Sequence, residues 1–225
     1  MQKYAVIGLG RFGSRLAMQL AEAGAEVVGI DRDEPIIEQI RDAVTLAVAM
    51  DGTDEQALRA QGLEQVDAAV VGIGADFEST VLTTVVLKHL GVPRVIARAG
   101  SRRAAEILSR IGATEVVNPE DEAADRWANR LLSPQFLSQY ELETGYSIVE
   151  MKAPDRWVGQ TLAQLDLRRE ANVHVVAIKP TAAPDDEAEA TRRVQLPGPH
   201  EPLKATDVLV LLGSDQALQQ LQADV

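Results

Sequence analysis

A glycine turn between a short apolar strand and a helix is the feature that most constrains how this chain can fold. The apolar run at residues 4–7 leads into the turn GLGRFG, and residues 11–23 then repeat apolar side chains at helical spacing. Gly8 permits the tight turn, Gly10 lets backbone approach a phosphate, and Gly13 lets the helix pack closely on the strand. The positive N-terminus of that helix would face a bound anion. This stretch therefore predicts the start of a dinucleotide-binding fold.

A second strand, residues 26–30, ends at Asp31, which lies 18 residues after Gly13. A carboxylate at this position can accept hydrogen bonds from the hydroxyls of an adenosine ribose, and it would repel a 2′-phosphate. Glycines in a turn are often only turn formers, so the GxGxxG pattern alone is a weak signal. Together with the strand, the helix and the acid, it predicts a site for an adenine nucleotide: ATP, ADP or NAD(H).

The composition excludes several other classes of protein. The 225 residues are 46% hydrophobic and carry a formal charge of −12, with a pI near 4.7. A nucleic-acid or anionic-membrane surface would need basic patches, so neither is expected. The absence of cysteine excludes disulfides and thiolate sites and fits a cytoplasmic protein. An early strand leaves no room for a signal peptide, and no apolar run approaches the roughly 18 residues of a membrane helix. We expect a soluble protein.

Beyond Asp31 the pattern keeps alternating between helices and strands. The expected helices are 35–41, 54–61, 77–90, 101–111 and 121–132, and the expected strands are 44–49, 67–73, 94–99 and 115–117. Such alternation predicts a parallel sheet with right-handed crossovers, so the fold class is α/β, a Rossmann-like doubly wound sheet. Ligands of such sheets bind at the carboxyl ends of the strands.

The candidate binding residues lie in the glycine turn and at these strand ends. They are Gly8, Gly10, Arg11, Phe12, Gly13, Asp31, Arg32, Asp51, Gly52, Ile73, Gly74, Ala75 and Arg98. The segment from Asp51 to Asp54 has two interpretations, an adenine-side contact or a plain helix N-cap. Arg11 would be electrostatically misplaced beside a helix N-terminus unless an anion compensates it, which favours an anionic ligand.

The periodicity changes in the last third of the chain. Short strands are expected at 147–151, 173–178 and 207–212, with a short helix opening at 157–161 and a last helix at 214–222. This pattern predicts a small α+β module. Because Ser133-Pro134 disfavours continuation of the preceding helix, we place a first domain at 1–138 and a second at 139–225. The acidic segment 179–191 is expected to be a solvated loop between strands, and Trp157 to be a core residue.

Several longer motifs resemble one known family. GLGRFG with Asp31, AAVVGIGADFESTVLTTVVLKHLG at 68–91, ARAG at 97–100 and IGATEVVNPE at 111–120 resemble the regulatory RCK subunits of bacterial Trk and Ktr potassium transporters. The likeness runs through essentially the whole chain. It implies an RCK N-terminal nucleotide-binding domain and an RCK C-terminal domain. It also implies dimers that assemble into a ring, an octamer or a tetramer of domains, and that gate a separate integral-membrane potassium subunit from the cytoplasmic side.

The resemblance also suggests roles for particular residues. Arg11 matches an arginine that reaches the terminal phosphate, sometimes that of a neighbouring subunit, and Arg98 is a second phosphate-side candidate. Glu120 matches a glutamate near a cation shared between two nucleotide sites. Arg168 aligns with an arginine that binds cyclic di-AMP in some relatives, but residues 171–174 depart from the turn of those relatives, which disfavours this ligand here.

The apolar character of the expected helix 77–90 bears on assembly. It is apolar on nearly every side, which predicts burial on more than one face. In the family the segment near 121–143 is a crossover exchanged between dimer partners. Surface that one copy cannot cover marks an interface, so we expect at least a dimer.

An NAD-dependent oxidoreductase is the alternative, because the same fold and acid occur in dehydrogenases. Such an enzyme needs an acid or base near the nicotinamide and a substrate domain. His89, His174 and His200 are scattered, no metal-ligand cluster is present, and the second module offers no convergent polar set. A DNA-binding regulator would need a helix-turn-helix segment and a basic face. We therefore expect a regulatory protein and not an enzyme.

Overall fold

The computed structural model describes residues 2–74, 76–180, 194 and 196–223. The chain divides into two compact units, Met1–Glu122 and Ala123–Val225, and each is described separately. Two features expected from the sequence, the candidate binding residue Ala75 and the acidic part of the segment 179–191, lie outside the described residues.

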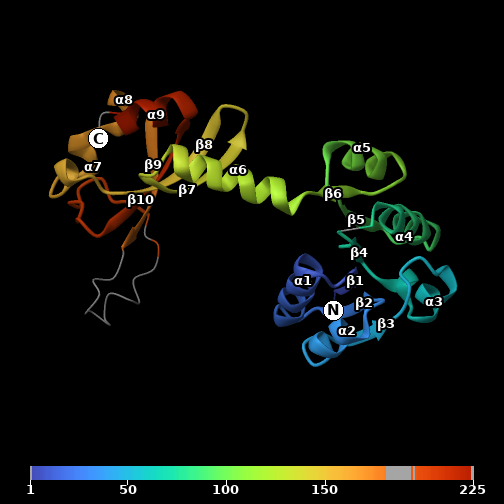
Figure 1. Ribbon diagram of the computed structural model, residues 1–225. Coiled ribbons are helices and arrows are strands. Elements are labelled where there is room, and N and C mark those ends of the chain that lie inside the picture. Colours follow the sequence, from blue (N-terminus) through green and yellow to red (C-terminus); the bar gives the residue numbers. More distant parts are fainter. Residues whose placement is uncertain (1, 75, 181–193, 195, 224–225) are drawn as a thin grey trace. The chain divides into compact units, whose positions relative to one another are not determined.

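The first unit consists of a parallel sheet with helices on both faces (Figure 1). Its elements are β1 (Lys3–Ile7), α1 (Arg11–Glu22), β2 (Glu26–Asp31), α2 (Glu34–Ile40), β3 (Leu46–Ala49), α3 (Glu55–Ala60), the 3₁₀ helix η1 (Leu63–Gln65), β4 (Ala68–Val71), α4 (Phe77–His89), β5 (Arg94–Arg98), α5 (Arg102–Arg110), β6 (Glu115–Val117) and the start of α6 (Pro119–Leu132). The strand order is β3-β2-β1-β4-β5-β6, and every pairing is parallel. The predicted doubly wound fold is confirmed.

Alternating side chains explain why helices cover both faces of this sheet. Ile7 and Ile30 belong to a buried cluster that includes Leu87 of α4, whereas the intervening Val6 belongs to a second cluster with Ala17 of α1. Because successive side chains of a strand point to opposite faces, β1 and β2 each supply apolar surface to both clusters. The blue helices α1 and α2 accompany β1–β3, and the green helices α4 and α5 accompany β4–β6 (Figure 1).

The reversal of strand order beside β1 positions the candidate site. From β1 the chain builds outwards to β2 and β3 on one side, and to β4, β5 and β6 on the other. Backbone hydrogen bonds hold the carboxyl ends of the three central strands together: Gly8 N–H donates to Ile30 O at 2.8 Å, and Gly72 N–H donates to Ile7 O at 2.7 Å. A crevice at such a switch point is where open α/β sheets bind ligands.

The second unit is built on an antiparallel sheet with the order β7-β8-β10-β9. Its elements after α6 are β7 (Phe136–Glu143), β8 (Tyr146–Lys152), the 3₁₀ helix η2 (Asp155–Trp157), α7 (Leu162–Leu165), α8 (Leu167–Glu170), β9 (Val173–Pro180), β10 (Asp207–Ser214) and α9 (Asp215–Ala223). Trp157 is buried in its core with Leu209 and Leu218, as predicted. The predicted small α+β module is confirmed.

One strand of this unit was not predicted, and one helix begins later than predicted. The segment 136–143 is strand β7, where the sequence analysis predicted no strand. A strand was hard to predict here because Phe136 is the only buried residue of β7, which is stabilised by its pairing with β8. The helix expected to open at 157–161 starts later, at Leu162, where Thr161 and Gln164 form a capping box.

Several apolar side chains of helices α4 and α6 are exposed to solvent. In α4 the residues Thr80, Thr83, Thr84 and Leu87 are buried, but Phe77 is 43% exposed and Leu82 is 46% exposed. The expected burial on more than one face is therefore not met within one chain. Helix α6 has no buried residue, and Trp127 is 55% exposed.

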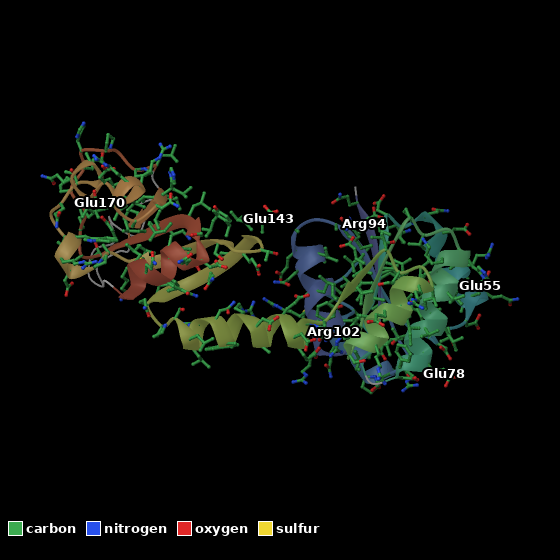
Figure 2. The ribbon with its side chains drawn as sticks, turned by 90° about the horizontal axis from the view of Figure 1, so that it is seen from above. Glu55, Glu78, Arg94, Arg102, Glu143 and Glu170 are labelled. Carbon is green, nitrogen blue, oxygen red and sulfur yellow. The ribbon has the colours of Figure 1, made fainter. Side chains whose placement is uncertain are left out.

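Polar contacts close the edge of the first sheet. Arg94, labelled in Figure 2, forms an ion pair with Glu115 at 2.6 Å and so joins β5 to the edge strand β6. The hydrogen bond and the charge of Glu115 raise the pKa of Arg94 above its ordinary value.

Among the described residues, no helix combines the length and the apolar character needed to cross a lipid bilayer.

Candidate nucleotide-binding site

A cavity of about 450 Å³ opens in the first unit at the carboxyl ends of the parallel strands. Its walls come from the glycine turn after β1, the segments after β2, β3 and β4, the start of α4 and the end of β5. The lining residues are Ile7, Gly8, Gly10, Asp31, Arg32, Ile36, Met50, Asp51, Gly52, Gly72, Ile73, Gly74, Asp76, Ser79 and Arg98. Most of the residues predicted from the sequence are therefore brought together in one place.

The three glycines of the turn have different surroundings. Gly8 has a φ of +88°, and a Cβ there would lie 2.7 Å from Ile73 N. A Cβ on Gly13 would lie 2.0 Å from Gly8 O, so only glycine lets α1 approach the turn this closely. A Cβ on Gly10 would have no described atom within 4 Å. Gly8 and Gly13 shape the turn, while Gly10 presents open backbone at the cavity.

Asp31 joins the glycine turn to the end of β2. Its Oδ2 accepts a hydrogen bond from Leu9 N–H at 2.6 Å, and its Oδ1 accepts one from Asp33 N–H at 3.0 Å. An ionised carboxylate offers about four acceptor positions, so these two bonds leave capacity for further donors. Asp31 thus fixes the turn and can also receive the hydroxyl groups of a ribose.

The two interpretations of the segment after β3 apply to different residues. Asp54 is the N-cap of α3 and accepts hydrogen bonds from Gln56 N–H at 2.9 Å and from Ala57 N–H at 3.1 Å. Asp51 lines the cavity and is not a cap. The backbone N–H and the hydroxyl of Thr53, each 2.8 Å from its Oδ1, lower the pKa of Asp51.

Asp76 and Ser79 add a second acidic position at the start of α4. Asp76 is the N-cap and accepts hydrogen bonds from the Ser79 hydroxyl at 2.6 Å and from Ser79 N–H at 3.1 Å. These bonds lower the pKa of Asp76, with the hydroxyl contributing most. The positive charge of Arg32 acts in the same direction on Asp51 and Asp76.

Arg98, at the end of β5, supplies positive charge to the wall of the cavity. Its side chain is 20% exposed and forms an ion pair with Glu120, which is 61% exposed, in the first turn of α6. A Cβ on Gly74 would lie 2.1 Å from Arg98 Nη1, so the absence of a side chain there makes room for the guanidinium. Arg98 Nε is buried and has no hydrogen-bond partner among the described residues.

Other predicted residues do not line the cavity. Arg11 is exposed in the first turn of α1 and forms no ion pair with any described residue, and Phe12 is half-buried. Gly13 acts through packing, as above. The carboxylate of Glu120 is engaged with Arg98. No group of three or more histidine or acidic side chains that could hold a metal ion occurs within the described ranges.

Six lining residues were not among the candidates predicted from the sequence: Ile7, Ile36, Met50, Gly72, Asp76 and Ser79. Ile36 and Met50 follow the ends of β2 and β3, the positions where an adenine ring would need apolar contacts, so their places after strands were the available signal. Asp76 and Ser79 have the spacing of a helix N-cap, a structural role that by itself gives no sign of a binding site. Such residues become part of a site only through the shared edge of the sheet.

The arrangement suits the recognition of a nucleotide. Apolar side chains, a ribose acceptor, open backbone and an arginine are the groups that recognise adenine, ribose and phosphate. None of the residues found to line the cavity is a histidine or a lysine.

In the second unit, Arg168 and His174 line a separate cavity of about 250 Å³ near α7, α8 and β9.

Comparisons with known proteins agree with this geometry. The TrkA-N domain family matches residues 4–119, and the TrkA-C domain family matches residues 146–224. Ktr system potassium uptake protein C of Bacillus subtilis is 35% identical over 213 residues, covering 95% of this chain and 92% of the relative. Ktr system potassium uptake protein A of Vibrio alginolyticus is 28% identical over 217 residues, covering 96% and 94%.

A solved structure extends the likeness to the fold. The GsuK RCK domain has a TM-score of 0.54 and 26% sequence identity; the match covers all of this chain but 47% of the solved one. The matched families cover both units, and the glycine turn, the acid at Asp31 and the doubly wound sheet are those of a nucleotide-binding Rossmann fold. The chain therefore belongs to the TrkA-N/TrkA-C family, the RCK regulatory subunits of Ktr and Trk potassium uptake systems.

Proposed function

We propose that this chain binds an adenine nucleotide in the cavity of its first unit and thereby gates a membrane potassium transporter subunit from the cytoplasmic side. One observation carries the proposal: at the switch point of the sheet, one cavity combines the open backbone of Gly10, the ribose acceptor Asp31 and the cationic Arg98. The names of the Ktr relatives support the link to potassium uptake.

The ligand we propose is ATP, ADP or NAD(H). The carboxylate of Asp31 has acceptor capacity for ribose hydroxyls beyond its two backbone bonds. A 2′-phosphate would bring a second negative charge against this carboxylate, so NADPH should bind poorly. The apolar Ile36 and Met50 suit the adenine ring.

Gating requires that the nucleotide bind one arrangement of the assembly better than another, because a ligand with equal affinity for both shifts nothing. ATP and ADP differ by the third phosphate, and we propose that Arg11 senses it, from the same or a neighbouring subunit. The exposure of Arg11 and its lack of an ion partner among the described residues support this role. The exposed apolar side chains of α4 and α6 support a dimer that builds a ring.

The proposal is tested by two measurements on the purified full chain. Mass spectrometry should identify an adenine nucleotide carried through purification. Potassium flux into vesicles that hold the matching membrane subunit should then differ between added ATP and ADP. Absence of both nucleotide binding and flux control would refute it. Hydride transfer from NADH to any of a broad panel of oxo acids would instead favour an oxidoreductase.

A further inference from the structure

We propose that Arg98 exchanges partners: it pairs with Glu120 as seen here, and it leaves this carboxylate for the phosphate of a nucleotide held in the cavity. The inference rests on the proposed nucleotide site and goes beyond it, because it makes the Arg98–Glu120 ion pair part of the ligand response. The sequence analysis expected Arg98 near a phosphate and Glu120 near a cation, but the ion pair between them is found only in the structure.

The position of Arg98 allows such an exchange. It ends β5 and contributes to the wall of the main cavity, and it also lines an adjoining cavity of about 290 Å³. Gly74 leaves the space that the guanidinium occupies, since a Cβ there would be 2.1 Å from Nη1. Arg98 therefore lines two neighbouring cavities.

The hydrogen bonding of Arg98 is incomplete in its pairing with Glu120. Nη2 contacts Glu120, but Nε is buried without a partner among the described residues. A buried donor without an acceptor is unfavourable. A phosphate offers several acceptor oxygens and can bind the fork of a guanidinium through two donors at once. It could satisfy groups that a single carboxylate oxygen leaves unsatisfied.

A phosphate can replace Glu120 as the partner of Arg98, and this replacement would affect the start of α6. Because it is 61% exposed, its pairing with Arg98 is largely screened by solvent, as in other exposed ion pairs. Its place in the first turn of α6 lets it interact favourably with the helix dipole after release. Helix α6 starts in the first unit and ends in the second. Exchange would thus alter the polar contacts where the connecting helix begins.

The test compares two ligands that differ only in phosphate. Binding of ADP and of adenosine to the full-length protein is measured by calorimetry at low ionic strength, with EDTA present to remove divalent cations. The variants are Glu120→Gln, Arg98→Gln and the double substitution. Glu122→Gln is the matched control, because it removes an exposed acid from the same helical turn without touching the ion pair.

Exchange predicts a specific pattern. Glu120→Gln should tighten ADP by about two- to fivefold, the range for an exposed ion pair that no longer competes. Arg98→Gln should weaken ADP at least about tenfold, the range for a lost hydrogen bond to a charged group. Adenosine affinity should stay unchanged in both, the double substitution should match Arg98→Gln, and Glu122→Gln should match the wild type.

Each other outcome overturns the inference in a different way. If Glu120→Gln leaves ADP affinity unchanged or weakens it, Glu120 does not compete with the phosphate, although the nucleotide site itself stands. If Glu120→Gln tightens ADP equally in the presence and absence of Arg98, general electrostatics and not exchange is responsible. If neither ADP nor adenosine binds the wild-type protein, the proposed function fails together with the exchange.

Discussion

Two glycines of the turn, Gly10 and Gly13, should respond differently to substitution by alanine. At Gly13 a Cβ would lie 2.0 Å from the carbonyl oxygen of Gly8, which is backbone and cannot rotate away. At Gly10 a Cβ would have no described atom within 4 Å, and the backbone at φ −62° and ψ −171° is accessible to alanine. Gly13→Ala should destabilise the first unit, whereas Gly10→Ala should mainly affect ligand binding.

The magnitudes follow from opposing contributions. Alanine inside a helix gains about 1 kcal/mol over glycine. Overpacking of a closely packed site costs about 1 to 3 kcal/mol, and occasionally more. A distance of 2.0 Å is far below any real contact between a non-bonded carbon and oxygen, so the cost at Gly13 should lie at or above the upper end. We expect a net loss of about 2 kcal/mol or more for Gly13→Ala and at most about 1 kcal/mol for Gly10→Ala at the N-cap.

The assay must report on the first unit alone, because the chain has two units and need not unfold in one step. Both tryptophans, Trp127 and Trp157, lie outside the first unit, so their fluorescence reports on the second. Hydrogen exchange of peptides from β1 and α1 gives the local opening free energy. Fluorescence-detected unfolding of the second unit should be unchanged and serves as the internal control.

Two results would contradict this reasoning. Wild-type protection of β1 and α1 in Gly13→Ala would show that the helix start can move without cost. A loss in Gly10→Ala as large as in Gly13→Ala would show that Gly10 is also confined by packing. In Gly10→Ala, calorimetry should show weaker ADP binding, since the new methyl group stands where backbone meets the cavity.

Further predictions concern the ligand, the sensor, pH and assembly. Asp31→Ala should weaken ADP binding by about 1 to 3 kcal/mol and should also reduce stability, because it leaves Leu9 N–H without its acceptor. If calorimetry showed that NADPH binds more tightly than ATP, ADP and NAD(H), the assignment of Asp31 as the ribose acceptor would be contradicted. Arg11→Ala should keep ADP affinity but lose the preference for ATP and the ATP-dependent change in flux; Arg98 is the next residue to test if both persist. The lowered pKa of Asp76 means that its carboxylate stabilises the fold above the ordinary value of 3.8, and that this contribution is lost as pH falls through the lower folded value. Asp76→Asn should therefore reduce the melting temperature at pH 7 more than at pH 3, and equal reductions would argue against the Ser79 bonds as the cause. Light scattering at micromolar concentration should give at least a dimer, and a monomer would refute the assembly.

Periodicity made the architecture of the first unit predictable. Its strands are short apolar runs and its helices repeat apolar residues at helical spacing, and both patterns are local properties of the chain. The parallel sheet followed from the alternation of strands and helices, because such connections are right-handed crossovers. Gly8 and Asp31 could be assigned because their spacing reflects the geometry of one strand–turn–helix unit and the next strand.

Elements with few buried side chains could not be predicted in the same way. Strand β7 carries one buried residue, Phe136, and exists through its pairing with β8. The segment from Asp51 to Asp54 contained equivalent acids, and only the folded chain separated the cap Asp54 from the cavity residue Asp51.

The sequence by itself determined the glycine turn, the acid that we propose as the ribose acceptor and the edge of the sheet where we propose that a ligand binds, because each depends on residues close together in the chain. Only the tertiary structure decided that Ile36 and Met50 complete the cavity and that Arg98 pairs with Glu120, 22 positions away. The physical reason is that a binding cavity forms where several strands end together. Which side chains meet there depends on packing and charge between segments that sequence spacing does not relate.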